Sequence, residues 1–270
     1  YIHWPNRAEV IEAQLKKIVA ITRDKLDNPH LNCYNSSMNK MYEFLKQNYD
    51  MKKFDHVTLN GELPEITTES IKGKRFYVTP EGNKYPSITT VLSDRNKEGI
   101  IKWRESVGND VANQVMRQAA SRGTAVHTLI ENYLNNEELS KQDVLPVALF
   151  ATIKSELDNI NNIRIQEGGL YSDKLGVAGR VDCIAEYKGK ISVIDFKTST
   201  KEKKEEWVEN YFIQGSAYCE MYEERFLQPI EQVVILIVTE DGAVQTFIKD
   251  KKDYLPLLKT AIKEFNEKNI

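Results

Sequence analysis

The sequence predicts an α/β (α+β) fold, in which helices and strands share one hydrophobic core. Three observations support this prediction. Residues 177–199 contain two β-type runs on either side of a Lys188-Gly189 turn, as in a β-hairpin. Residues 233–238 form a continuous apolar run, VVILIV, which is typical of a strand buried on both faces. Residues 250–268 have the apolar spacing of an amphipathic helix.

The first 50 residues differ from the rest of the chain. Apolar residues recur at helical spacing in residues 9–26 and again in 36–47, so a helical extension is predicted for residues 1–50. Residues 51–54, MKKF, resemble a translation start, which would make residues 1–50 a fused or upstream segment. An ordinary internal methionine is the alternative.

Residues 51–270 alternate between helices and strands. After a strand that begins at Lys74, Ser87 is placed to cap a helix, and Gly123 inside a later helix predicts a close backbone approach. The following elements are predicted: helices at roughly 97–107, 109–135 and 143–160; a strand at 163–170 ending near Glu167; strands at 177–185 and 191–196; a helix at 205–225; strands at 233–238 and 244–248; a helix at 250–268. The core order is a helix, three strands, a helix and two strands.

Composition excludes several classes of protein. The chain has 270 residues, 41% of them hydrophobic and 29% charged, and a formal net charge of -3. No apolar run approaches the roughly 18 residues that cross a bilayer, so no membrane association is expected. The three cysteines lack metal-site spacing and cannot all pair, which favours a reducing, intracellular compartment. Nucleic-acid binding would require a local basic surface.

Two carboxylates and a lysine converge in the predicted hairpin. Asp182, Asp195 and Lys197 have the spacing D-x12-D-x-K, and such oxygen ligands suit Mg²⁺ or Mn²⁺. Lys197 shares a strand face with Asp195, while Phe196 points to the other face and offers its backbone carbonyl to a metal. Strand-end carboxylates with a solvated lysine are the alternative. The apolar residues around both aspartates argue against it, because buried charges need compensation.

Other residues complete this candidate metal-dependent phosphodiesterase site. Glu167 is a third carboxylate, although a surface glutamate is an equal alternative. His127 is a candidate metal ligand, although a histidine in an apolar helix is more often structural. Gln214 and Tyr218 lie four residues apart on one helix face and could contact nucleic acid or position the lysine.

Candidate DNA contacts are basic or aromatic. They are Arg122, Arg180, Lys174 and Arg104 for phosphates, and Trp103 and Tyr133 for stacking on bases.

The assembled motifs resemble the PD-(D/E)XK nuclease superfamily. The motifs are Glu167, Asp182 in GRVD, Asp195-Phe196-Lys197, Gln214-x-x-x-Tyr218 and Arg122-Gly-x-x-x-His127. The RecB-like branch with its QxxxY motif is the most similar, and residues 177–199 are similar to mitochondrial genome maintenance exonucleases and related phage exonucleases. Val181 stands where the family usually has a proline, which removes no ligand.

The resemblance covers about residues 75–265 and implies a restriction-endonuclease-like core, with a mixed β-sheet flanked by helices. It implies Mg²⁺- or Mn²⁺-dependent hydrolysis of DNA, with a metal between His127, Glu167, Asp182 and Asp195. Lys197 would be catalytic, with Gln214 and Tyr218 in support. Because the four-cysteine cluster of some relatives is missing, no iron–sulfur cluster is expected.

We therefore expect an exonuclease that digests single-stranded DNA from its ends in replication, repair or recombination. A RecB-like nuclease domain would span 51–270, with its catalytic core at 163–265 and a helical arch at 97–135. Residues 1–50 could bind replication or recombination proteins. The compartment would be the host cytoplasm for a phage or bacterial source and the mitochondrion for an organellar one. The alternatives are a structure-specific endonuclease and a non-catalytic DNA-binding accessory module.

Overall fold

The computed structural model describes residues 52–93, 95 and 97–269. The helical extension predicted for residues 1–50 and the methionine at position 51 lie outside the described residues. In the part that is described, no helix is both long enough and apolar enough to cross a membrane.

A five-stranded mixed sheet forms the centre of the molecule. Its strands, in spatial order, are β4 (Ile160–Ser172), β5 (Val177–Tyr187), β6 (Lys190–Ser199), β7 (Gln232–Thr239) and β8 (Val244–Asp250). Strands β6 and β7 are parallel, and the other neighbours are antiparallel. Helix α7 (Glu209–Phe226) makes the crossover that a parallel pair requires. The predicted mixed sheet and element order are confirmed.

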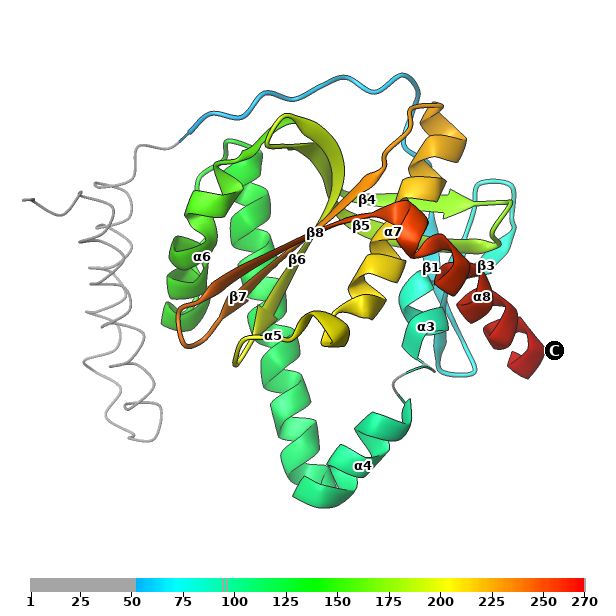
Figure 1. Ribbon diagram of the computed structural model, residues 1–270, viewed down its shortest axis with the longest axis horizontal. Helices are drawn as coiled ribbons and strands as arrows, with labels where there is room; N and C mark the ends of the chain where they lie inside the picture. The colour runs from blue at the N-terminus through cyan, green and yellow to red at the C-terminus, as the bar shows by residue number, and fades with distance from the viewer. Residues whose placement is uncertain (1–51, 94, 96, 270) are drawn as a thin grey trace, which may run out of the picture.

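Helices cover both faces of this sheet (Figure 1). The helices on one face are α5 (Asn109–Leu134) and α6 (Val144–Leu157), and those on the other are α3 (Ile88–Ser93), α7 and α8 (Leu255–Asn269). Along β7, Val234 and Leu236 pack toward α5 and α6, whereas Val233 and Ile235 pack toward α7 and α8. The VVILIV run is therefore buried on both faces, as predicted.

Several local predictions can be compared with the structure. Lys188 and Gly189 have φ values of 51° and 79°, which confirms the hairpin turn. Strand β4 continues to Ser172, so the prediction that it ends near Glu167 is wrong. A Cβ atom added to Gly123 would lie 3.9 Å from Thr198 Oγ1, an ordinary contact, so the predicted close approach is also wrong.

A second, three-stranded sheet precedes the main one. Its antiparallel strands are β1 (Thr67–Ile71), β2 (Lys74–Val78) and β3 (Lys84–Pro86). A bridge between Ser87 and Ala178 joins this region to β5, and Tyr77 packs on Ala178 and Tyr171. Ser87 Oγ accepts a hydrogen bond from the backbone N–H of Thr90 at 3.0 Å, which confirms the predicted helix cap.

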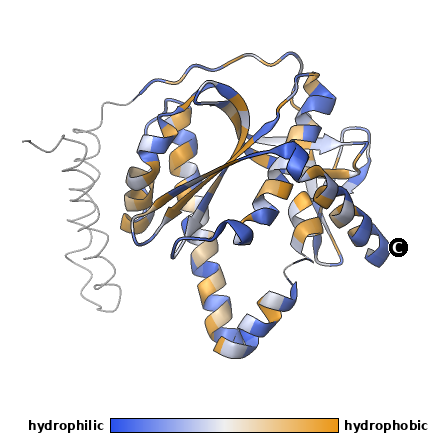
Figure 2. Cartoon of the chain, in the orientation of Figure 1, coloured by the Kyte–Doolittle hydropathy of each residue, from blue (hydrophilic) through white to orange (hydrophobic). Residues whose placement is uncertain are grey.

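Helix α4 (Lys97–Val107) and the first half of α5 form an arm that projects from the core (Figure 1). Gly108, with φ of 85°, makes the bend between the two helices. Arg104 braces this bend by donating to Asn113 Oδ1 at 2.6 Å. Several apolar side chains of the arm are exposed: Ile100, Ile101, Val107, Val111, Val115 and Met116. Figure 2 shows hydrophobic residues interspersed along both helices of the arm.

Candidate active site

Strands β5 and β6 separate where the predicted carboxylates lie. Their pairing ends at Cys183 and Ile194, while β6 continues beside β7 to Ser199. Beyond this point the Asp182 carboxylate replaces the missing backbone partner, since its Oδ2 accepts a hydrogen bond from the Phe196 N–H at 2.9 Å. The separation of the strands therefore makes room for side chains and fixes the orientation of Asp182.

His127 faces the same gap from helix α5. It lies in the second half of α5, between the buried residues Val126 and Leu129. Its Nε2 is 2.8 Å from the carbonyl oxygen of Phe196. Because a carbonyl only accepts hydrogen bonds, Nε2 carries a proton. In the neutral ring Nδ1 then has a free lone pair.

Glu167 reaches the gap through an irregular backbone. Its φ of 46° is unusual for a residue with a side chain and falls inside β4. Gly168 and Gly169 follow, and an added Cβ at Gly169 would lie 2.6 Å from Ile66. Such conformations cost about 1–3 kcal/mol and concentrate at functional sites. The distortion is therefore consistent with a position held for its side chain.

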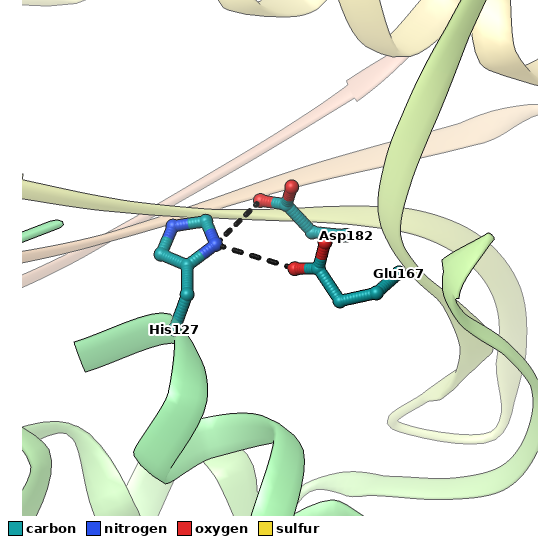
Figure 3. Close-up of side chains that lie close together, drawn as sticks. All are labelled: His127, Glu167 and Asp182. Carbon is teal, nitrogen blue, oxygen red and sulfur yellow. Dashed lines mark ion pairs between the residues drawn. The ribbon is translucent and has the colours of Figure 1, made fainter. Parts of the chain in front are cut away.

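These three side chains form a compact cluster (Figure 3). His127 Nδ1 is 3.6 Å from Glu167 Oε1 and 3.8 Å from Asp182 Oδ2. One donor atom from each residue lies within 4.8 Å of the other two. One imidazole nitrogen and two carboxylate oxygens suit a borderline or hard divalent cation. The donor set therefore fits a divalent metal ion.

Asp195, which is buried, and Lys197, which is half-buried, form an ion pair next to the cluster. Asp195 Oδ2 contacts the ammonium group, yet it lacks a hydrogen bond of good geometry among the described residues. Burial raises the pKa of Asp195. Burial lowers the pKa of Lys197, but the charges of Asp195 and Asp182 outweigh it and raise that pKa overall. Lys197 is therefore cationic at neutral pH.

The carboxylates also control the charge of His127. Burial lowers the pKa of this imidazole, but the adjacent Glu167 and Asp182 raise it by more, so that the pKa is about 9. Without a metal, the ring therefore carries protons on both nitrogens and a positive charge at neutral pH. The protonated imidazole thus places a positive charge next to the two carboxylates, as a bound metal ion would.

Comparisons with known proteins agree with this geometry. Residues 146–268, which include two of the three cluster residues and the Asp195–Lys197 pair, match the model of the PD-(D/E)XK nuclease superfamily. These residues form a PD-(D/E)XK nuclease domain. Proteins of this superfamily are hydrolytic nucleases, and they generally use divalent metal ions.

Curated relatives of the nuclease domain are exonucleases. Mitochondrial genome maintenance exonuclease 1 of Homo sapiens is 28% identical over 132 residues, which are 45% of this chain and 38% of the relative. Its Mus musculus counterpart is 28% identical over 131 residues, 45% of this chain and 39% of the relative. The chain thus spans about two fifths of the length of these relatives.

A solved structure of a candidate exonuclease from Eubacterium rectale is also similar. Its TM-score is 0.41 at 13% identity, and the match covers 54% of this chain and 65% of that chain.

Helix α7 of the nuclease domain packs against the ion pair. Gln214 Nε2 donates to the Tyr218 hydroxyl at 3.3 Å, so the two predicted residues do share a helix face. Burial raises the pKa of Tyr218, which stays a neutral hydrogen-bonding group. The Lys197 ammonium lies 5.1 Å from the ring centroid of Tyr211, on the same helix.

Sequence reasoning missed Tyr211, although a signal was present. Positions 211, 214 and 218 follow the i, i+3, i+7 spacing of one helix face, so Gln214 and Tyr218 already indicated this residue.

The site opens into a cleft of about 900 Å³. Its lining includes His127, Glu167, Asp182, Gln214, Tyr218 and, among the predicted DNA contacts, Arg180. Asp195 and Lys197 are not among the residues that line the cleft, and Phe196 uses its carbonyl to accept the His127 hydrogen bond. The predicted use of that carbonyl as a metal ligand stays a prediction.

The other predicted DNA contacts lie outside the cleft lining. Arg122 pairs with Glu240 and donates to Thr198 Oγ1, and Arg104 braces the bend of the arm. Lys174 is exposed in the turn between β4 and β5, and Trp103 is half-buried on α4. Tyr133 is buried and donates to Asp158 at 2.5 Å, so the prediction that it stacks on a base is wrong.

Proposed function

We propose that this protein is a divalent-metal-dependent exonuclease that hydrolyses single-stranded DNA from its ends. One observation carries the proposal: His127 Nδ1, Glu167 and Asp182 converge in an open cleft, beside the ion pair of buried Asp195 and half-buried Lys197. This arrangement supports phosphodiester hydrolysis, because it combines a cation site with a separate positive charge.

Each residue of the site has a proposed role. Bound Mg²⁺ or Mn²⁺ would lower the pKa of a water molecule and offset charge on the scissile phosphate. His127, Glu167 and Asp182 hold the ion, and Asp195 orients Lys197 and completes the carboxylate set. Because Lys197 is cationic, it stabilises charge that develops on the phosphate and does not abstract a proton. Gln214 and Tyr218 support the site from α7.

Several features support a DNA strand as the substrate. The relatives are named as exonucleases of mitochondrial genome maintenance. The arm, within the arch proposed for residues 97–135, continues along α5 directly from the turn that carries His127. A strand that passes the exposed apolar side chains of the arm would enter the cleft at Arg180.

The proposal extends to organisation and context. A RecB-like nuclease domain spans 51–270, with its catalytic core at 163–265, and residues 1–50 are a separate segment that binds replication or recombination proteins. The protein acts in DNA replication, repair or recombination inside a cell, in a reducing compartment. Deletion of residues 1–50 is expected to leave cleavage of purified DNA unchanged.

End-blocked substrates test this function. The protein is incubated with linear single strands blocked at the 5′ or the 3′ end and with a covalently closed single-stranded circle. The incubations contain Mg²⁺, Mn²⁺ or a chelator. With metal, we expect the linear strands to shorten, a block on at least one end to protect them, and the circle to stay intact. With chelator, we expect no cleavage. A cut circle would indicate an endonuclease, and metal-independent binding without any cleavage would indicate an accessory module.

A lysine variant tests the proposed chemistry. Lys197→Ala should reduce cleavage by at least about 100-fold while the affinity for DNA is retained, since Lys197 acts on the transition state. Lys190→Ala, at the exposed start of the same strand, is the matched control and should cleave normally. Normal turnover by Lys197→Ala would contradict the assignment.

A further inference from the structure

The cleft has a second wall, which the three-stranded sheet and α3 provide. Thr67, Thr68, Arg75, Tyr77 and Thr89 line the cleft together with the metal cluster. This sheet lies beside α3 and α8 (Figure 1), and the Lys74 ammonium on β2 lies 4.8 Å from the Phe265 ring centroid on α8. The wall is therefore a fixed part of the fold.

Arg75 is held in this wall at both ends. Its Nη2 donates to Thr89 Oγ1 at 2.7 Å, and Thr89 Oγ1 lies 2.9 Å from Ser87 Oγ. Its backbone carbonyl accepts hydrogen bonds from the Ser87 N–H at 2.9 Å and from Thr90 Oγ1 at 3.3 Å. The guanidinium carbon also lies 5.8 Å from the ring centroid of Tyr77. These contacts reduce the conformational freedom that an exposed arginine otherwise loses on binding.

The guanidinium of Arg75 is oriented but has no anionic partner. It is exposed and forms no ion pair with any residue that the structure describes. An arginine has five N–H donors, and Thr89 takes only one of those on Arg75. Arg122 differs, because its charge is neutralised by Glu240.

The carboxylates around the cleft explain why binding of DNA there requires positively charged side chains. Glu65, Glu167 and Asp182 bring three carboxylates to its lining, and these repel a polyanion. Among the described residues, the only lysine or arginine side chains that line the cleft are Arg75 on one wall and Arg180 on the other. The two arginines face the cleft from different sheets.

We propose that Arg75 and the adjacent threonine hydroxyls form a phosphate subsite on this second wall. The subsite binds a phosphodiester group of the substrate strand next to the one that is cut, and so sets the register of the strand over the metal cluster. Arginine suits this task because its planar fork can bind two phosphate oxygens at once. The inference rests on the proposed nuclease function and assigns it a substrate-binding group.

Kinetics at several salt concentrations test the subsite. Arg75→Ala is compared with wild type on single-stranded DNA with Mg²⁺. KM should rise about tenfold while kcat changes less than about twofold, because binding is lost and chemistry is kept. The slope of log KM against log salt should fall by about 0.7, the value for one phosphate contact on a single strand. Arg75→Lys should lie between the two, since it keeps the charge and loses the fork.

Lys84→Ala is the matched control. Lys84 lies on β3 of the same sheet, is paired with Glu69 at 2.7 Å and does not line the cleft. It should leave KM and the salt slope unchanged. Equal behaviour of Arg75→Ala and Lys84→Ala, or a fall in kcat at constant KM, would overturn the subsite.

Binding measurements separate this inference from the proposed function. The affinity of the full chain for a fluorescent single strand is measured with Ca²⁺ in place of Mg²⁺. Kd should rise about tenfold in Arg75→Ala. If the wild type cuts no DNA, the nuclease proposal fails. The Kd ratio then still decides whether Arg75 binds phosphate, and a ratio of one overturns the subsite.

Discussion

The two halves of α5 have opposite surroundings. In residues 126–134, Val126, Leu129, Ile130, Tyr133 and Leu134 are buried against the sheet and α6, and this half carries His127. In residues 109–120, Ala112 is the only buried residue, and Val111, Val115 and Met116 are exposed. The packing of the buried half fixes the position of His127, the proposed imidazole ligand. The exposed half leaves apolar groups free, which is typical of a surface that contacts something else.

The largest expected effect is on the free energy of unfolding, which should respond differently to substitutions in the two halves of α5. Leu129→Ala removes a fully buried side chain and should lower the free energy of unfolding by about 2–5 kcal/mol. Val111→Ala, at a position that is 52% exposed, should change it by less than about 0.5 kcal/mol. Urea unfolding followed by circular dichroism measures both. A large effect of Val111→Ala would mean that another part of the protein covers the arm.

The second prediction concerns chemistry in the buried half. His127→Ala removes the imidazole donor and should weaken Mn²⁺ binding and cleavage by about 100-fold or more. Thr124→Ala, an exposed position three residues earlier on α5, is the control and should change neither. Calorimetric titration with Mn²⁺ and a cleavage assay provide the readouts. Unchanged Mn²⁺ affinity in His127→Ala would remove the imidazole from the proposed ion site.

The sequence alone predicted the parts of the structure that follow from local periodicity. The hairpin depends on a two-residue turn, the central strand on a continuous apolar run, and the shared face of Gln214 and Tyr218 on helical spacing. Each of these signals involves residues close together in the chain. The placement of His127 in an apolar helical run was likewise visible, although its facing partners were not.

The rest depends on contacts between residues far apart in sequence. Arg122 and Glu240 are 118 positions apart, so spacing could not show that this arginine is already paired. Glu167 has a positive φ and precedes Gly168 and Gly169, where an added Cβ would collide with Ile165 or Ile66, and the two glycines were the only local sign of an irregular strand. The second wall of the cleft joins β2 to a site on β5, about a hundred positions later.

The third prediction is a pH dependence that the buried half creates. The pKa of His127 is about 9, above its ordinary value of 6.5, so a proton must leave when a metal binds near neutral pH. The apparent Mn²⁺ affinity should therefore rise about tenfold per pH unit from about pH 7 to pH 9 and then level off. Calorimetry in two buffers with different ionisation enthalpies counts the released proton.

The same pKa shift makes the stability of the metal-free protein depend on pH. The folded pKa is higher than the unfolded one, so protonated His127 stabilises the fold fully below about pH 6.5. That contribution is lost as the pH rises toward 9. Mn²⁺ affinity that stays constant between pH 7 and pH 9 would contradict both statements.

The smallest expected effect tests the exposed half. Val111, Val115 and Met116 can be replaced together by serine. Because these side chains are exposed, the free energy of unfolding should change by no more than about 0.5 kcal/mol per site. If the arm contacts bases of an incoming strand, KM for long single strands should rise about fivefold, which corresponds to about 1 kcal/mol. Dinucleotide substrates, which are expected to occupy only the cleft, should show no change. If the triple variant and the wild type have equal KM values for long strands, the arm does not contact the substrate and the cleft is the whole binding site.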